Sequence, residues 1–251
     1  NFSGKKITLK CQGDPGACIL DGNGSGPLVT FTGEEDASTV LDGFTIRNGF
    51  GNKGGGIKID ESSPIIQNCI ISGNNTTNDG GGIYIYDGSP RIMNCIISDN
   101  IIERNGGGIY FKGYENSLYI ENVIFSDNIA TENGGGLYIS SGNVKVISSL
   151  FDGNKSEDKY GGGIYSVSAQ LKLEICEFRN NESNLKGGGI FLLNSNGFTA
   201  HQTIVDKNSS GQGGGMFLFN SESASMINCI MTNNSSPFGG GSIFLDKQSN
   251  L

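Results

Sequence analysis

The sequence predicts an all-β fold: a parallel β-helix, which is a solenoid of about nine coils with 26–28 residues in each coil. Three observations predict it: a glycine run that returns at nearly constant spacing, an asparagine before each later run, and short β-type segments between these marks. A period of about 20–50 residues is typical of solenoids, propellers and other repeat arrays. One unit of such an array cannot bury its apolar face alone, so successive units stack.

The glycine runs set the period. Successive runs are separated by 26, 26, 28, 27, 26, 26 and 26 residues, and they begin at Gly54, Gly80, Gly106, Gly134, Gly161, Gly187, Gly213 and Gly239. Glycine lets a backbone turn sharply where a Cβ atom would clash. We therefore expect each run to lie at a bend just before a strand.

The segments between the runs are short and rich in turn residues. One coil contains "SPRIMN", "CIIS" and "GGGIYF". Helical repeats need an apolar period of about 3.6 residues and tolerate few glycines, and a propeller blade needs about 40 residues. Three strands in this space fit one coil of a parallel β-helix, and because strands stack about 4.8 Å apart, nine coils give a rod about 40 Å long.

An asparagine stands before each later glycine run, at Asn74, Asn100, Asn128, Asn154, Asn181, Asn208 and Asn234. Asn48 and Asn23 extend this series toward the N-terminus. Asparagine tolerates left-handed backbone angles at a bend, and stacked carboxamides can bond to one another and to turn carbonyls. The sequence therefore predicts an internal asparagine ladder.

Alignment on this asparagine gives columns of small or apolar residues, which we expect to point inward. Three residues earlier stand Ile71, Ile97, Phe125, Phe151, Phe178, Val205 and Met231. Five residues earlier stand Cys69, Cys95, Val123, Ser149, Cys176, Thr203 and Cys229. Eight residues earlier stand Ile66, Ile92, Ile120, Val146, Leu173, Ala200 and Met226. Strand alternation adds inward pairs after the glycine runs, among them Ile57/Ile59, Ile83/Ile85, Ile109/Phe111, Leu137/Ile139, Ile190/Leu192 and Ile243/Leu245.

The motif "NCIISDN…GGGIYF", with its asparagines, cysteine and glycine run in register, resembles the right-handed parallel β-helix repeat proteins of the pectate-lyase-like superfamily. It is most similar to the polymorphic outer-membrane-protein and adhesin-type repeats of bacteria and archaea, and the resemblance covers essentially the whole chain. It implies a right-handed coil, the hand that parallel crossovers nearly always have. The motif marks turns and core positions, so it is informative about fold rather than activity.

Residues 1–251 are expected to form a single β-helix domain. The chain opens and closes on strand-like segments, "NFSGKKITLK" and "SIFLDKQSNL", so we interpret it as part of a longer protein whose end caps lie elsewhere. Its net charge of −8 disfavours a nucleic-acid groove or an anionic-membrane patch. No apolar run approaches the roughly 20 residues that span a bilayer.

An aromatic column is the main candidate for a binding surface. It lies between the two inward positions after each glycine run, where alternation turns it outward, and it comprises Tyr84, Tyr110, Tyr138, Tyr165, Phe191, Phe217 and Phe244. One interpretation is ring-on-ring stacking that stiffens the sheet. The other is an exposed platform for a glycan or another protein chain. A parallel aliphatic column, which Glu177 interrupts, contains Ile70, Ile96, Ile124, Leu150, Ile204 and Ile230.

Catalytic or metal-binding carboxylates would have to share a column on adjacent coils. Asp99 and Asp127 are the best such pair, and Ca²⁺ is the cofactor that two carboxylates could hold. The alternative is that both are solvated turn residues. The only histidine, His201, has no fixed partner in the pattern, so we expect no catalytic residues and no cofactor other than this Ca²⁺ candidate.

The six cysteines fall into two groups. Cys69, Cys95, Cys176 and Cys229 share an inward column with Val, Ser and Thr, which indicates small buried thiols. Cys11 and Cys18 bracket the turn "QGDPGA" and are the candidate disulfide if the protein is exported.

These observations favour a non-catalytic rod that is extracellular or lies at a cell surface, either adhesin-like or structural, with polysaccharide or another protein chain as the candidate partner. The near-uniform coils and the short loops point away from an enzyme. The alternative is a polysaccharide lyase or glycoside hydrolase that acts on acidic polysaccharide. Acids that converge in a cleft would favour that alternative.

Overall fold

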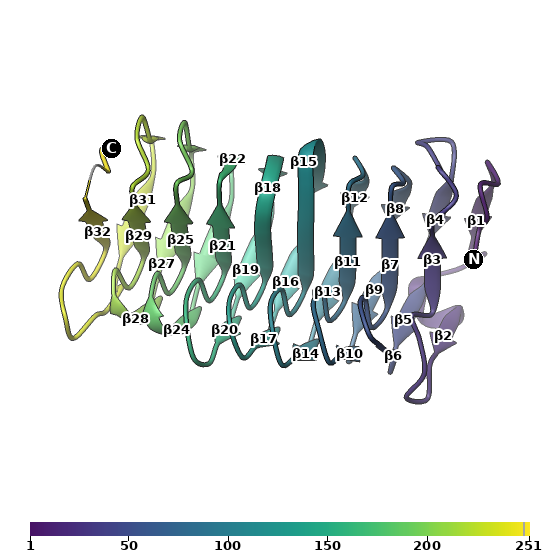
Figure 1. Cartoon of the computed structure of the whole chain (residues 1–251). Helices are drawn as coiled ribbons and strands as arrows, with labels where there is room; N and C mark the ends of the chain where they lie inside the picture. The colour runs from purple at the N-terminus through teal and green to yellow at the C-terminus, as the bar shows by residue number, and fades with distance from the viewer. Residues whose placement is uncertain (248) are drawn as a thin grey trace.

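The chain forms one continuous stack of coils with its two termini at opposite ends of the rod (Figure 1). The computed structural model describes residues 1–247 and 249–251. Over these residues the secondary structure is strand and turn, and the one helical element is the short 3₁₀ helix η1 (Pro15–Ala17). The predicted all-β solenoid of about nine coils is confirmed.

The strands form three parallel sheets along the rod. The first and largest, sheet 1, has two rows of strands. Its first row follows the glycine runs and faces the viewer in Figure 1; it contains β3 (Val29–Phe31), β7 (Ile57–Asp60), β11 (Ile83–Tyr86), β15 (Ile109–Glu121), β18 (Leu137–Ile147), β21 (Ile164–Val167), β25 (Ile190–Leu193), β29 (Met216–Phe219) and β32 (Ile243–Asp246). Its second row contains β1 (Thr8–Lys10), β4 (Val40–Asp42), β8 (Ile65–Gln67), β12 (Arg91–Met93), β22 (Ala169–Glu174), β26 (Thr199–His201) and β30 (Ser225–Ile227).

The long strands β15 and β18 run through both rows and join them. Sheet 2 contains β2 (Ile19–Asp21), β5 (Thr45–Arg47), β9 (Ile70–Ser72), β13 (Ile96–Ser98), β16 (Ile124–Ser126), β19 (Leu150–Asp152), β23 (Glu177–Arg179), β27 (Ile204–Asp206) and β31 (Ile230–Thr232). Sheet 3 contains β6 (Phe50–Gly51), β10 (Asn75–Thr76), β14 (Ile101–Ile102), β17 (Ile129–Ala130), β20 (Lys155–Ser156), β24 (Glu182–Lys186) and β28 (Ser209–Gln212).

The register between coils follows the repeat. Ile97 pairs with Phe125, which pairs with Phe151, and both ladders are parallel. The predicted inward columns are buried through most of the rod; Ile71, Ile120 and Leu173, for example, have no exposed surface. Burial falls at the last coil, where Met231 is half-buried and Leu245 is 45% exposed, because that coil packs against a neighbour on one side only.

The asparagine ladder runs through the interior from Asn74 to Asn234. At each step the side-chain amide donates to the carboxamide oxygen of the next asparagine, over 2.9–3.1 Å. The same amide donates to a backbone carbonyl; Asn128 Nδ2, for example, bonds Ile97 O at 2.8 Å. Six of the seven side chains have no exposed surface. The ladder therefore supplies hydrogen-bond partners to buried polar groups that water cannot reach.

The structure corrects two details of this column. The left-handed backbone angles belong to the residue before each ladder asparagine, for example Asp99 (φ 56°) and Asn180 (φ 54°). Asn48 lies in that preceding column, and Gly49 takes the ladder position, where its N–H donates to Asn74 Oδ1. Asn23 is exposed and does not extend the ladder. The error at Asn48 arose because the segment between the ladder position and the glycine run is one residue shorter in this coil, so that Arg47 pairs with Ser72.

The glycine runs lie at the bend before the first row of sheet 1, as expected. A Cβ atom on Gly107 would come within 2.5 Å of the Gly135 carbonyl oxygen, because carbonyls of adjacent coils are stacked there. In the last coil the register differs from the sequence alignment. Ile243 pairs with Met216, so Gly240, Gly241 and Ser242 occupy the run and Gly239 precedes it.

We predict that Asn128→Ala lowers the free energy of unfolding by about 3 kcal/mol or more, because it leaves several buried donors and acceptors unpaired and creates a cavity. Denaturant unfolding measures this effect. The control is Asn75→Ala on the exposed side of β10, for which we expect a change within about 0.5 kcal/mol. Equal effects of the two substitutions would contradict the role of the ladder.

Candidate functional site

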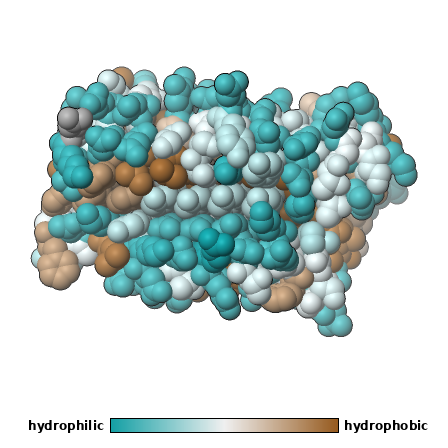
Figure 2. Space-filling view, viewed as in Figure 1, coloured by the Kyte–Doolittle hydropathy of each residue, from teal (hydrophilic) through white to brown (hydrophobic). Residues whose placement is uncertain are grey.

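The aromatic column lies on the outer side of the first row of sheet 1 and forms a continuous stack. Ring centroids of successive coils are 5.0–5.4 Å apart and the rings are within 15° of parallel, from Tyr84 to Phe244. Figure 2 shows this face, where a band of side chains crosses the middle and becomes more hydrophobic toward the C-terminal end. The rings therefore lie face to face along the rod and direct their edges away from the coil.

The rings are less exposed than the platform interpretation requires. Tyr84, Tyr165, Phe191 and Phe217 are 4%, 7%, 4% and 0% exposed, and Tyr110, Tyr138 and Phe244 are half-buried. Of the two interpretations, ring-on-ring stacking is the one observed, and the four buried rings do not form a bare platform. Because both faces of most rings already contact another ring, only ring edges are available to a partner.

The chain itself covers these rings. At Lys53, Tyr160 and Lys186, the residue just before the glycine run packs over the ring of the next coil. Lys53 Nζ lies 4.9 Å from the Tyr84 centroid, and Lys186 Nζ lies 4.4 Å from that of Phe217. Tyr160 stacks on Phe191 at 4.8 Å. We call the residues just before the first six glycine runs the cover column: Lys53, Asp79, Asn105, Asn133, Tyr160 and Lys186. Because these residues differ in chemistry, the sequence alone did not reveal their shared position over the rings.

Part of the cover column forms a second, shorter ladder. Asn105 Nδ2 donates to Asp79 Oδ1 at 3.1 Å, and Asn133 Nδ2 donates to Asn105 Oδ1 at 2.8 Å. Among the described residues, Asn133 Oδ1 is the one buried side-chain oxygen or nitrogen without a hydrogen-bond partner. Sequence reasoning missed this ladder, although an acid or amide precedes three successive glycine runs.

Burial in the stack changes the pKa of the tyrosine hydroxyls. Burial raises the pKa of Tyr110 and Tyr138 far above the ordinary value of 10.0, and it raises the pKa of Tyr165 to about 12. The neutral phenols are therefore the stable form throughout the physiological range, and none of these three hydroxyls is poised to act as a base.

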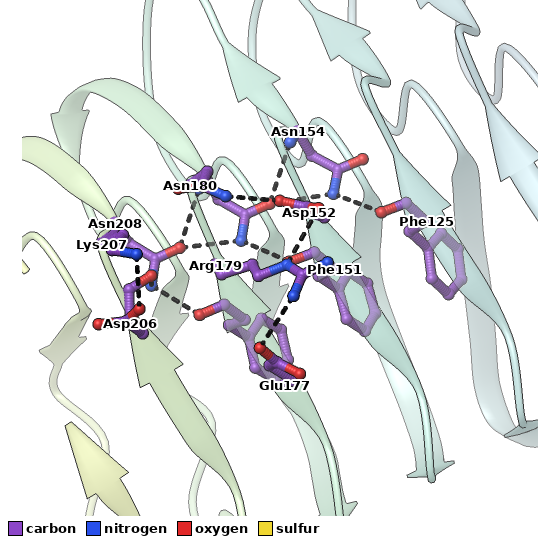
Figure 3. Close-up of polar contacts among 12 residues, drawn as sticks. Phe125, Phe151, Asp152, Asn154, Glu177, Arg179, Asn180, Asp206, Lys207 and Asn208 are labelled. Carbon is purple, nitrogen blue, oxygen red and sulfur yellow. Dashed lines mark hydrogen bonds and ion pairs between the residues drawn. The ribbon is translucent and has the colours of Figure 1, made fainter. Parts of the chain in front are cut away.

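The carboxylates do not converge into a catalytic cleft. Asp99 and Asp127 occupy neighbouring turn positions, as predicted, and partial burial, followed by the like charges of Asp99 and Asp152, raises the pKa of Asp127. Asp152 has other partners: it forms an ion pair with Arg179 Nε at 3.0 Å and accepts a hydrogen bond from Asn180 Nδ2 (Figure 3). Within the described residues, no group of three or more His, Cys, Asp or Glu side chains could hold a metal ion. The Ca²⁺ candidate therefore rests on two carboxylates alone.

Two buried acids, Glu35 and Asp42, were missed in the sequence. Glu35 is 1% exposed and accepts hydrogen bonds from the N–H groups of Gly4 and Gly33 and from the Ser62 hydroxyl. Burial acts to raise its pKa, but these three bonds outweigh burial and hold the pKa below the ordinary value. Its partners are two backbone N–H groups and one hydroxyl from three successive coils, so Glu35 links the N-terminal segment to the next two coils by hydrogen bonds.

His201 and the six cysteines are the remaining singled-out side chains. His201 is exposed at the end of β26, and Glu174, its register neighbour, pairs with Lys145 at 3.0 Å. Cys11 and Cys18 form a disulfide with their Cα atoms 5.9 Å apart. Cys69, Cys95 and Cys176 are buried free thiols, and Cys229 is half-buried. The structure therefore brings no nucleophile and base together at His201.

The aliphatic column of sheet 2 is the more exposed of the two apolar columns. Ile96, Ile124, Ile204 and Ile230 are 38%, 40%, 38% and 54% exposed. Glu177 interrupts the column and is held by Arg179 at 3.4 Å. We call this column the aliphatic ridge; its side chains are more exposed than those of the aromatic stack, which the chain itself partly covers.

The comparisons with known proteins agree with this architecture. The family model described as a right handed beta helix region matches residues 18–124 and 108–251. Neither curated proteins nor solved structures gave a match to the chain. No helix of the described residues is long and apolar enough to cross a membrane.

We predict that stability falls as pH rises above about 10. Between pH 10 and about 12 the unfolded Tyr165 phenol loses its proton while the folded one keeps it, so the unfolded state binds fewer protons and gains stability. Tyr165 alone accounts for about 1 kcal/mol of this loss at pH 11, and for more as the pH nears 12. Unfolding at pH 7 and about pH 11 tests it, with Tyr165→Phe as the matched control that should lose less. An equal loss in Tyr165→Phe would contradict the assignment.

We also predict that four thiols react in the denatured, unreduced chain and six after reduction, because the four column cysteines are free and Cys11 is bonded to Cys18. A thiol-reactive dye counted by mass spectrometry gives both numbers. Six reactive thiols before reduction would contradict the disulfide.

Proposed function

Since the chain belongs to the right-handed β-helix family, we propose that it is a non-catalytic rod of an extracellular or cell-surface protein, adhesin-like or structural. The observation that carries this proposal is the unbroken asparagine ladder, whose seven residues keep successive coils in one register from β9 to β31. A uniform internal ladder favours length and stiffness, whereas a catalytic site needs unlike groups brought to one point.

Two further features support the proposal. The acids of sheet 2 that face solvent are mostly held in pairs, such as Asp21 with Arg47 at 2.8 Å and Asp152 with Arg179 at 3.0 Å. Disulfides persist in oxidising compartments, so the Cys11–Cys18 bond favours a location outside the cytoplasm.

The rod offers two apolar surfaces to a glycan or protein partner. The aliphatic ridge of sheet 2 presents side chains such as Ile96 and Ile124 to solvent. On sheet 1 a partner could reach the half-buried edges of Tyr110, Tyr138 and Phe244, while the buried rings stiffen the rod. Exposed apolar rows of this extent commonly mark contact surfaces.

A turnover assay tests the non-catalytic assignment against the alternative of a lyase or hydrolase. We predict that the chain releases no new sugar ends from pectin-like and other uronate polymers, with or without Ca²⁺. The double variant Asp99→Asn/Asp127→Asn should behave identically, because these residues act only as turn residues. Cleavage that this double variant abolishes would establish the enzyme and remove the proposal.

A further inference from the structure

The one strong irregularity of the rod lies at its middle. In most coils the strand of the first row of sheet 1 ends before the strand of the second row begins. The strands β15 and β18 instead continue through the corner between the two rows and are 13 and 11 residues long. They stand out as the longest strands in Figure 1. Their pairing shifts register between Phe111 and Ser117, within the coil whose glycine-to-glycine spacing is 28 residues. Added backbone thus reshapes the surface beside the second row.

Two adjoining depressions of about 280 and 300 Å³ lie at this corner, and Asn143 and Gln170 line both. Ser117, Tyr119, Lys145 and Lys172 line the first depression. Tyr114, which is 49% exposed, lines the second together with Asn194 and Asn196. The two form one shallow groove across successive coils, with amides along its centre.

The charge of this groove is opposite to that of the chain. The net charge is −8, yet Lys145 and Lys172 stand in register on neighbouring strands and none of the lining residues is acidic. Arg91 extends the cationic column beyond Tyr119, and its guanidinium lies 4.8 Å from that ring. Two acids beside the groove neutralise part of this charge: Glu174 pairs with Lys145 at 3.0 Å, and Glu121 accepts a hydrogen bond from the Tyr119 hydroxyl.

We propose that this groove binds a linear anionic glycan. Register places Tyr119, Lys145 and Lys172 one coil apart, a step of about 4.8 Å, which suits a polymer whose anionic groups recur along its length. Asn143 and Gln170 can donate to and accept from sugar hydroxyls, and Tyr114 offers an exposed ring. A nucleic acid is disfavoured, because its binding depends on many phosphate contacts that so acidic a chain lacks. The inference rests on the proposed non-catalytic role and names its ligand class.

Binding of the 251-residue chain to three immobilised polymers tests the inference: polygalacturonate, which carries carboxylates, dextran sulfate, which carries sulfates, and neutral dextran. We expect binding to at least one polyanion, weakened by added salt, and none to neutral dextran. The polyanion with the higher affinity identifies the anionic group. Absence of binding to both polyanions at low salt would overturn the inference.

A pair of matched variants separates the groove from general charge effects. Lys145→Ser/Lys172→Ser should weaken binding roughly ten- to hundredfold, because both ammonium groups bond the anions directly. The control, Lys155→Ser/Lys207→Ser, removes the same charge from other faces of the rod, and we expect it to retain most of the affinity. An equal loss in both double variants would overturn the groove assignment.

Gln170→Glu adds a negative charge at the exposed centre of the groove without changing side-chain size. It should weaken binding about tenfold, whereas Gln12→Glu in the N-terminal turn should leave binding unchanged. Thermal unfolding of both variants verifies that the fold is kept. Unchanged binding by Gln170→Glu, or tighter binding to a single-stranded oligonucleotide than to either glycan, would count against the inference. Cleavage of polygalacturonate would instead remove the non-catalytic role, while the dextran sulfate arm still tests the groove.

Discussion

The interior of this rod depends on one constraint: a polar group buried in a coil must find its hydrogen-bond partner in the adjacent coil, because water cannot reach it. The asparagine ladder meets this constraint with a side chain that both donates and accepts. Asn154, for example, accepts from Asn128 and donates to Asn181. Five residues earlier, across one strand of sheet 2, the repeat accepts Cys, Val, Ser or Thr, but it keeps the same amide at the ladder position in seven successive coils.

The same vertical spacing organises the outer surface in a different way. Parallel strands stack about 4.8 Å apart, close to the 5.0–5.4 Å at which the outward rings contact one another. Aromatic residues in this column therefore bury their faces against each other and need little help from a partner. The cover column completes the burial with chemically different side chains, an ammonium at Lys186 and a ring at Tyr160. Stacking and cover together make this column a second, outer core.

The fold could be predicted from the sequence because period, strand content and inward columns all depend on the repeat. The errors lie where the repeat is broken. Asn48 resembled a ladder residue, but a shorter coil shifts it by one position, and the ladder position falls on Gly49. The cover column escaped notice because its residues share a position and not a chemistry. The groove between Tyr114 and Lys172 also escaped, because it arises from two strands that continue through a corner, which no local motif records.

The regularity of the rod also bears on the kind of function it suits. A catalytic site needs unlike groups at one point, whereas a register of stacked coils repeats like groups along a line. Where like acids repeat, as at Asp99 and Asp127, partial burial, followed by the like charge of Asp99, raises the pKa of Asp127, and the column changes to glycine on either side. Where lysines repeat, as at Lys145 and Lys172, a partner with repeating charge of opposite sign relieves the repulsion. Several weak contacts at fixed spacing then add up to useful affinity, which favours a polymer over a small molecule as the ligand of such a surface.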